Sequence, residues 1–397
     1  MANHAVDVTK KSLTTLKAFN FFLYGTIAIL TAFFPVYFEE IGLSKVEIGM
    51  VMAVGPFISI FANPFWGYWS DRLQNVKRIL TILLIGNMLV TIVVFQLREF
   101  VIIFLVMLVF FFFNTPTFSQ SNSLILNAIE GTKFKFGAFR WWGSLGWALI
   151  AVLAGPVIAK TGITNLWILY GSMMIISLFF TAGLPRGKVT SKPVKERQSY
   201  WEVISANKLF FVFVVLGVLI SVPNSINNTF SSLYITSLGG SKQLIGWSAF
   251  LAAIFEIPVF LLLDKYLKKS KKTMIGSLVI VSMLFVLRWA LMSLAVSPLQ
   301  IIFIQSLHCI TFGGYYYVGT SLTAMLIPSE YRASGQAIYA LTWGGVSGII
   351  AGLSGGWMFE SLGPQKMYSI SALISIIGVF GFLIMWLKLR NQTEQPS

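Results

Sequence analysis

The chain consists of twelve apolar runs, each about 20 residues long, separated by short polar segments. A helix of this length crosses the hydrocarbon core of a bilayer, where every backbone N–H and C=O must be hydrogen-bonded within the protein. Only 11% of the residues are charged, against about a quarter in soluble domains. We therefore expect an all-α membrane protein with twelve transmembrane helices. The expected spans are residues 16–38, 46–69, 79–97, 100–127, 137–159, 164–184, 208–236, 245–263, 273–295, 299–326, 333–358 and 365–387.

Basic residues are distributed unequally between the two ends of these spans. Most of the 29 Lys and Arg residues fall on the side of the N-terminus and of the long central loop. The opposite side holds only Lys45, Arg98, Lys160, Lys242 and Lys366. Loops rich in Lys and Arg stay in the cytoplasm, so we expect a multi-pass protein of the cell membrane with both termini cytoplasmic. The net charge of +15 then reflects topology, and no nucleic-acid partner is expected.

The longest polar segment divides the chain into two halves. We expect an N-terminal six-helix half at 1–184, a cytoplasmic central loop at 185–207 and a C-terminal six-helix half at 208–397. The halves repeat one another, since Asp71 and Arg72 follow span two as Asp264 follows span eight. Internal repeats of this kind are typical of secondary transporters. We expect Asp71, Arg72 and Asp264 to form cytoplasmic gates, although topology alone also accounts for these charges.

Four ionisable side chains lie deep within the expected spans: Arg140, Glu256, Arg288 and His308. A charge in hydrocarbon is costly, so such groups indicate a substrate or ion pathway. Glu256 is the only carboxylate among them. It would bind a proton when separated from Arg288 and lose it when Arg288 approaches, which couples a proton to a conformational change. The alternatives are a permanent Glu256–Arg288 ion pair and a His308 that serves helix packing instead of a proton relay.

Arg140 and Trp147 are candidates for binding a solute. Their spacing of seven residues places them on one face of a helix. A guanidinium binds vicinal hydroxyls or a carboxylate in bidentate fashion, and an indole face suits a sugar or an aromatic ring. The alternatives are that Arg140 reaches to lipid headgroups and that Trp147 packs. Asn224 and Asn227 either line a cavity or hydrogen-bond between helices.

These residues resemble the major facilitator superfamily. The Asp71-Arg72 loop is similar to its signature, with Gln74 where the family has glycine. Segments along the chain resemble the lactose permease and phenylpropionate permease group of oligosaccharide:proton symporters, at Phe33–Pro35, Gly137–Leu149, Leu287–Trp289 and Leu307–Cys309. The resemblance implies a monomer with two pseudo-symmetric six-helix halves that works by alternating access. It also implies that Arg140 binds substrate and that Trp147 stacks on it.

Several charges of that group are absent. Its acids fall on Asn122, Asn224, Asn227 and Thr311 here, and one basic partner falls on Gln305. Two acid–base pairs are thus replaced by neutral side chains together. We expect Asn122, Asn224 and Asn227 to join substrate binding, and Glu256, Arg288 and His308 to remain for proton coupling.

The function expected from these residues is secondary active transport. The favoured hypothesis is proton-coupled symport of a small polar organic solute, a sugar or glycoside. Alternatives are a proton-coupled exporter of drugs or metabolites, an importer of aromatic acids or nucleosides, and a membrane sensor. No nucleotide-binding loop, metal-ligand cluster or nucleophile elbow occurs, so we expect no enzymatic activity, cofactor or metal. The expected partners are the solute, protons and the lipid bilayer.

Overall fold

The computed structural model describes residues 10–130, 132, 134, 136–185, 207–328 and 331–394. All regular elements among these residues are helices, and eleven of them are long and apolar enough to cross a membrane. The chain is therefore an all-α membrane protein. The basic residues of the predicted central loop, from Arg186 to Arg197, lie outside the described residues.

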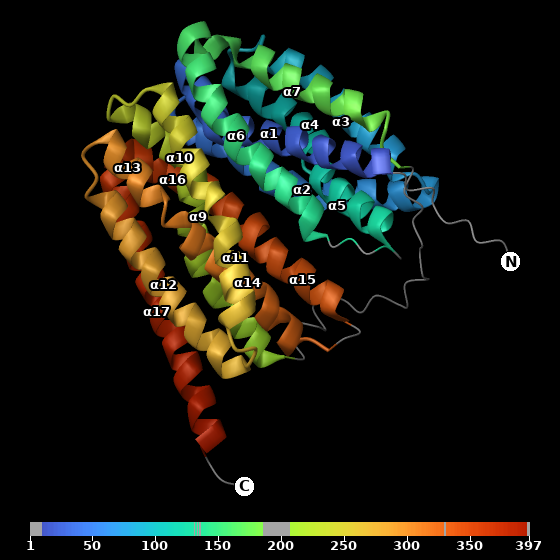
Figure 1. Ribbon diagram of the computed structural model, residues 1–397. Coiled ribbons are helices and arrows are strands. Elements are labelled where there is room, and N and C mark those ends of the chain that lie inside the picture. Colours follow the sequence, from blue (N-terminus) through green and yellow to red (C-terminus); the bar gives the residue numbers. More distant parts are fainter. Residues whose placement is uncertain are drawn as a thin grey trace, which may run out of the picture. The chain divides into compact units, whose positions relative to one another are not determined.

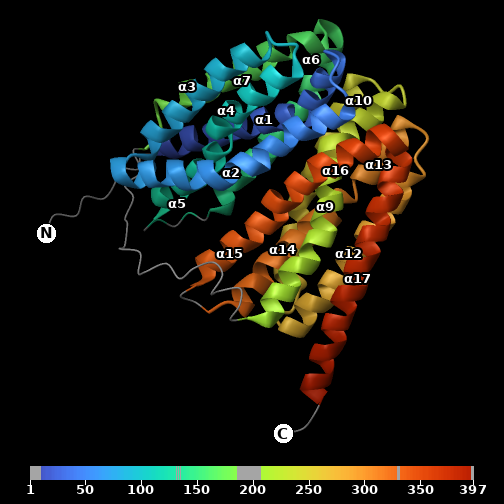
Figure 2. The ribbon, with the colours of Figure 1, turned by 180° about the vertical axis from the view of Figure 1, so that it is seen from behind.

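The helices are shown in Figures 1 and 2. The N-terminal half contains α1 (Lys10–Glu40), α2 (Lys45–Leu73), α3 (Val76–Val94), α4 (Phe100–Asn114), α5 (Pro116–Ile129), α6 (Gly137–Thr161), η1 (Ile163–Asn165) and α7 (Leu166–Thr181). The C-terminal half contains α9 (Lys208–Ser237), α10 (Lys242–Ile254), α11 (Glu256–Tyr266), α12 (Lys271–Ser293), α13 (Pro298–Gln305), α14 (His308–Leu326), α15 (Arg332–Ala340), η3 (Leu341–Val346), α16 (Ser347–Leu362) and α17 (Pro364–Glu394).

The chain forms two compact units. Unit 1 comprises Met1–Lys195 with Ser241–Phe250, and unit 2 comprises Glu196–Gly240 with Leu251–Ser397. Unit 1 therefore includes the start of α10, whereas the other helices of the C-terminal half belong to unit 2.

In unit 1, α1 packs along α6, and α3 packs against α4 and α7. A Cβ atom on Gly146 of α6 would overlap the carbonyl oxygen of Phe21 in α1, and one on Gly143 would meet the ring of Tyr24. Glycine at both positions lets the two backbones approach closely. This approach brings Tyr24 to the α6 face that carries Arg140.

In unit 2, α12 packs along α17, and the two lie side by side in both views (Figures 1 and 2). A stack of buried rings joins three helices, with Tyr234 of α9 on Tyr368 of α17 at 5.7 Å between centroids and Tyr368 on Trp289 of α12 at 6.0 Å. This stack holds α12 in place beside α9, and Arg288 precedes Trp289 in the same helix.

Four expected spans are not continuous α-helices. Span four divides at Thr115, as expected before a proline, because Pro116 begins α5. Span ten divides into α13 and α14, so it is absent from the eleven long apolar helices. Span eleven contains a π-helical turn, η3. The fourth is span eight. Span seven, in contrast, is continuous, because α9 runs unbroken through Pro223. All twelve expected spans are thus present as helices, some of them in pieces.

The interruption of span eight falls at Phe255, directly before Glu256. Pro258 explains it, because proline has no N–H to donate to Ile254 and its ring clashes with that carbonyl. Span ten is bent by polar side chains that bond to its own backbone. Ser306 Oγ donates to Phe303 O at 2.6 Å and Thr311 Oγ1 to Leu307 O at 2.8 Å.

Candidate functional site

Glu256 and His308 face each other in unit 2. Glu256 is the first residue of α11 and His308 the first residue of α14. Glu256 Oε1 lies 3.6 Å from His308 Nε2, and both side chains are largely buried, at 19% and 13% exposed. Both residues therefore lie at the N-terminal, positive end of a helix dipole.

Arg288 lies on the other side of His308 and is fully buried. Its Nη1 lies 3.1 Å from His308 Nδ1 and also donates to Thr311 Oγ1 at 3.1 Å. Because a guanidinium can only donate, His308 Nδ1 must accept here. His308 is then the neutral tautomer whose Nε2–H faces Glu256. A proton on Nδ1 would set two donors against each other, so Arg288 cannot keep this contact when His308 is charged.

Neutral side chains extend this network to α9 and α17. Arg288 Nη2 donates to Gln305 Oε1. Gln305 Nε2 donates to Asn227 Oδ1 at 3.0 Å, and Asn227 Nδ2 donates back at 3.3 Å. Tyr368 OH also donates to Asn227 Oδ1, at 3.1 Å. Asn227 and Gln305, two of the neutral side chains expected in place of charged ones, thus exchange two hydrogen bonds.

Two polar atoms near this network have no hydrogen-bond partner among the described residues. They are Nε of Arg288 and Oδ1 of Asn224, which is 2% exposed. Asn224 lies one turn before Asn227 in α9. A buried polar atom without a partner costs free energy, so both atoms are available to a ligand or water.

The predicted solute-binding residues of the N-terminal half lie in unit 1. Arg140 Nη1 donates to Ser144 Oγ at 3.2 Å, and its guanidinium lies 4.3 Å from the ring centroid of Tyr24. Trp147 lies two turns further along α6 and is half-buried. Asn122 of α5 is also half-buried, and its Oδ1 has no partner among the described residues. The guanidinium–ring contact holds Arg140 within the protein.

The expected gate residues differ in their surroundings. Asp264 Oδ1 accepts from Tyr317 OH at 2.9 Å and from Lys269 Nζ at 3.0 Å, which ties the end of α11 to α14. The hydrogen bond to Asp264 raises the pKa of Lys269. Arg72 instead lies over the Trp69 ring and beside Tyr68 in its own helix, and Asp71 is exposed.

Two features were not predicted from the sequence: the membership of Tyr368 in the network and the interruption before Glu256. Pro258 was a usable signal for the interruption, whereas no local pattern marks Tyr368. The stacking of Trp343 of η3 on Tyr315, at 4.5 Å between ring centroids, was also not predicted. Among the described residues no group of His, Cys, Asp or Glu side chains could hold a metal ion.

Comparisons with known proteins agree on one fold. A family model described as the MFS_1 like family matches residues 13–370. The chain is 25% identical to the uncharacterized transporter YwbF of Bacillus subtilis, covering 98% of this chain and 97% of that protein. It is 23% identical to the maltose permease of Geobacillus stearothermophilus, covering 96% of each. A crystal structure of the nucleoside transporter NupG superimposes with a TM-score of 0.83 at 18% identity, covering 94% of this chain and 99% of that one.

Proposed function

Because the chain belongs to the MFS_1 like family, we propose that it is a secondary transporter that moves a small polar organic solute together with protons by alternating access. Relatives that match this chain over nearly their whole length are named as transporters, not as enzymes. The observation that carries proton coupling is the buried chain of contacts from Glu256 through His308 to Arg288.

We propose that this chain of contacts alternates between two arrangements, of which the structure contains the first. With His308 neutral, Nδ1 accepts from Arg288 and Nε2–H faces Glu256, so α11, α12 and α14 are held together. A proton that binds His308 at Nδ1 removes the acceptor of Arg288 and forces these two side chains apart, while Nε2–H stays toward Glu256. A proton held on Glu256 removes its charge and weakens its attraction for the same cluster. Each event biases the packing of three helices, which a proton-driven transporter requires.

The solute is proposed to contact the predicted binding residues, some of which have polar atoms without a hydrogen-bond partner among the described residues. Arg140 offers a bidentate donor for hydroxyl groups, and Trp147 offers a flat apolar face. Asn122 and Asn224 each have an Oδ1 that is not hydrogen-bonded among the described residues. Asn227 is a weaker candidate than the sequence suggested, because Gln305 and Tyr368 already occupy it.

A sugar or glycoside is the favoured solute. Arg140 and Trp147 pair a hydroxyl-binding group with a stacking surface, and a relative over nearly the full length is named a maltose permease. We propose that the chain is a member of the lactose permease-like group. We further propose that the protein works as a monomer in the cell membrane and that the side rich in Lys and Arg faces the cytoplasm. Asp71, Arg72 and Asp264 are proposed to form gates on that side.

Uptake into sealed proteoliposomes tests this proposal. Purified protein is reconstituted, a panel of sugars, glycosides, nucleosides and aromatic acids is offered, and uptake is followed with and without an imposed inward proton gradient. We expect the gradient to drive accumulation of at least one solute in the wild type. Glu256→Gln should abolish accumulation but keep solute binding, because the amide cannot exchange a proton.

Glu99→Gln is the matched control. Glu99 is an exposed carboxylate before α4 that makes no side-chain cap hydrogen bond, so its replacement should leave uptake unchanged. Uptake that ignores the gradient, or that persists in Glu256→Gln, contradicts the coupling. Proton-driven extrusion of amphipathic drugs would contradict import and assign the exporter function.

A further inference from the structure

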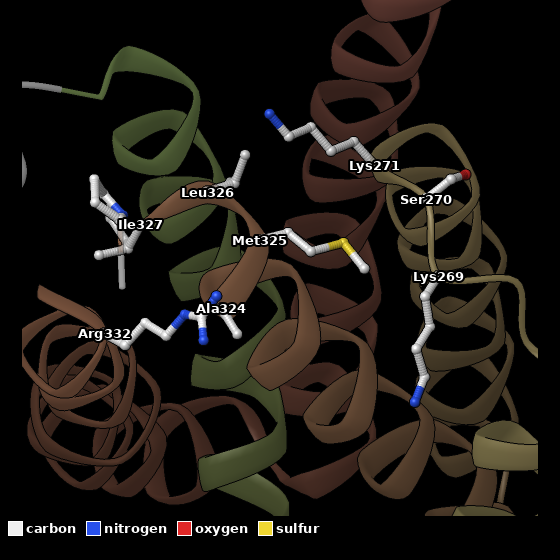
Figure 3. A pocket seen from close by; sticks show the side chains of 9 residues that line it. Lys269, Ser270, Lys271, Ala324, Met325, Leu326, Ile327 and Arg332 are labelled. Atoms are coloured by element: carbon white, nitrogen blue, oxygen red, sulfur yellow. The ribbon is translucent and has the colours of Figure 1, made fainter. Parts of the chain in front are cut away.

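Unit 2 contains a hollow of about 620 Å³ at the ends of its helices, away from the Glu256 network. It is lined by the loop before α12, the last turn of α14 and the first residue of α15 (Figure 3). Lys269 and Lys271 lie on one side of it, and Arg332 lies on the opposite side, near Ile327 (Figure 3). The apolar part of the lining includes Met325 and Ile327. The lining thus combines cations with an apolar surface.

Among the described residues, no carboxylate lines this pocket to balance its cations. Lys269 is paired with Asp264, which lies outside the lining. Lys271 and Arg332 are both exposed and have no ion pair among the described residues. Lys271 and Arg332 line the hollow from two sides, and like charges in one hollow repel each other unless an anion lies between them. The pocket therefore favours an anionic ligand.

Backbone groups around the pocket add to this preference. Lys271 begins α12, a helix of 23 residues, and Ser270 caps that helix by accepting from the backbone N–H of Thr273. The first N–H groups of a helix attract phosphate. At the opposite wall α14 ends, and the Leu326 carbonyl that would repel an anion is already bonded to Asn207 Nδ2 at 2.7 Å.

We propose that this pocket binds a phosphate group, supplied by the headgroup of an anionic phospholipid or by a soluble phosphate. Arg332 and Lys271 approach the phosphate from two sides, and Met325 and Ile327 contact the apolar part of an amphipathic ligand. The pocket lies where α11 ends and α12 begins, on the side that carries most basic loops, where the headgroups of the cytoplasmic leaflet are expected. This inference does not depend on the transported solute.

Binding to purified full-length protein in detergent tests the proposal. One arm titrates phosphatidylglycerol and cardiolipin against phosphatidylcholine, and the other titrates inorganic phosphate. Both are read by thermal unfolding and, for lipids, by native mass spectrometry. We expect the anionic lipid to bind more tightly than phosphatidylcholine. Lys271→Gln with Arg332→Gln should weaken binding roughly five-fold for each base removed.

Two further variants complete the design. Lys388→Gln with Arg390→Gln removes one Lys and one Arg from exposed positions of α17 outside the pocket and should leave binding unchanged. Ala324→Trp fills the hollow without changing charge and should also weaken binding, which separates the pocket from surface charge in general.

Each outcome decides the proposal. Loss of anionic lipid binding in both pocket variants, with phosphate inert, assigns the site to a lipid headgroup. Loss of phosphate binding in the same variants assigns it to a soluble phosphate. Equal binding by wild type and pocket variants, or equal loss in the α17 control, overturns it and leaves the proposed transport untouched. Unfolding of the glutamine pair is checked with Lys271→Arg and Arg332→Lys, which should retain binding.

Discussion

Glu256 and His308 both follow an interruption of their spans, and their side chains meet there at 3.6 Å between Oε1 and Nε2. Each is the first residue of the helix that follows, α11 and α14. An interruption frees backbone groups and lets a helix end move with respect to its preceding part. The two ionisable groups proposed to bind a proton therefore lie at the places where these spans can bend.

The first prediction concerns the interruption itself. Pro258→Ala restores an N–H that can donate to the carbonyl of Ile254, so α10 and α11 should join into one helix. Joining turns Glu256 about the helix axis and away from His308. We expect proton-driven accumulation to fall at least ten-fold while solute binding persists, as measured by uptake and by thermal shift. Pro298→Ala is the control, since Pro298 begins α13, where proline is tolerated. Equal effects of the two changes would contradict a role for the interruption at Pro258.

The second prediction concerns the neutral pair of Asn227 and Gln305. Gln305→Lys places an ammonium beside the buried Arg288 and should lower stability by roughly 3 kcal/mol. Adding Asn227→Asp supplies a counter-charge and should recover about 1 kcal/mol or more of coupling energy. The apparent unfolding midpoints in detergent form the double-mutant cycle. Asn224→Asp is the matched control, because no hydrogen bond joins Asn224 to Gln305 in the structure. Equal recovery by both acids would show that the pairing is not specific.

The third prediction concerns the close approach of α1 and α6. Gly146→Ala introduces a Cβ that overlaps the carbonyl oxygen of Phe21, so the helices must separate. We expect a loss of about 1–3 kcal/mol in stability and weaker solute binding through Arg140. Gly171→Ala in α7 meets no atom within 4 Å and should be neutral or slightly stabilising. The stabilities of both variants are compared by thermal unfolding. A Gly146→Ala variant as stable as the wild type would contradict the prediction.

The fourth prediction is a pH dependence at the end of α11. The hydrogen bond with Asp264 raises the pKa of Lys269 above its ordinary value of 10.5. A raised pKa stabilises the folded protein below the unfolded pKa, and this contribution is lost as the pH rises through the folded value. The difference in unfolding midpoint between wild type and Lys269→Gln should thus be present at pH 8 and disappear as the pH rises beyond 10.5 through the raised pKa of the folded state. It should be small and weaken with salt, since both side chains are more than half exposed.

Lys268→Gln provides the control for that titration, because Lys268 is an exposed neighbour in the same loop. Its midpoint should follow that of the wild type at every pH. A difference for Lys269→Gln that persists unchanged at high pH would exclude the ion pair as its cause.

Much of the fold followed from local sequence. The twelve apolar runs appear as helices because backbone groups in lipid have to be paired within each span. The division at Thr115 followed from Pro116. The interruption before Glu256 could also be predicted from Pro258. The division of span ten could not, because Ser306 and Thr311 bend a helix only when their hydroxyls donate to its own carbonyls.

The candidate site was predictable in part. Glu256, Arg288 and His308 stand out as ionisable groups in apolar runs, and the structure gathers them in unit 2. The resemblance marked Asn224, Asn227 and Gln305 as neutral replacements, but only the structure shows that Asn227 is the partner of Gln305. Tyr368 lies 141 positions from Asn227, and no local pattern marks it. The roles of Arg140, Trp147 and Asn122 in solute binding stay predictions.

The sequence by itself determined that this chain is a bundle of membrane helices and which few charges it keeps inside, because hydrocarbon thickness sets span length and desolvation removes charges without a role. Only the tertiary structure decided that His308 stands between Glu256 and Arg288 and must accept from the arginine. Each residue turns about 100° around its helix axis, so small changes in helix ends and packing decide which side chains meet. That rotation is set by contacts such as Trp289 on Tyr368, made between residues far apart in the chain.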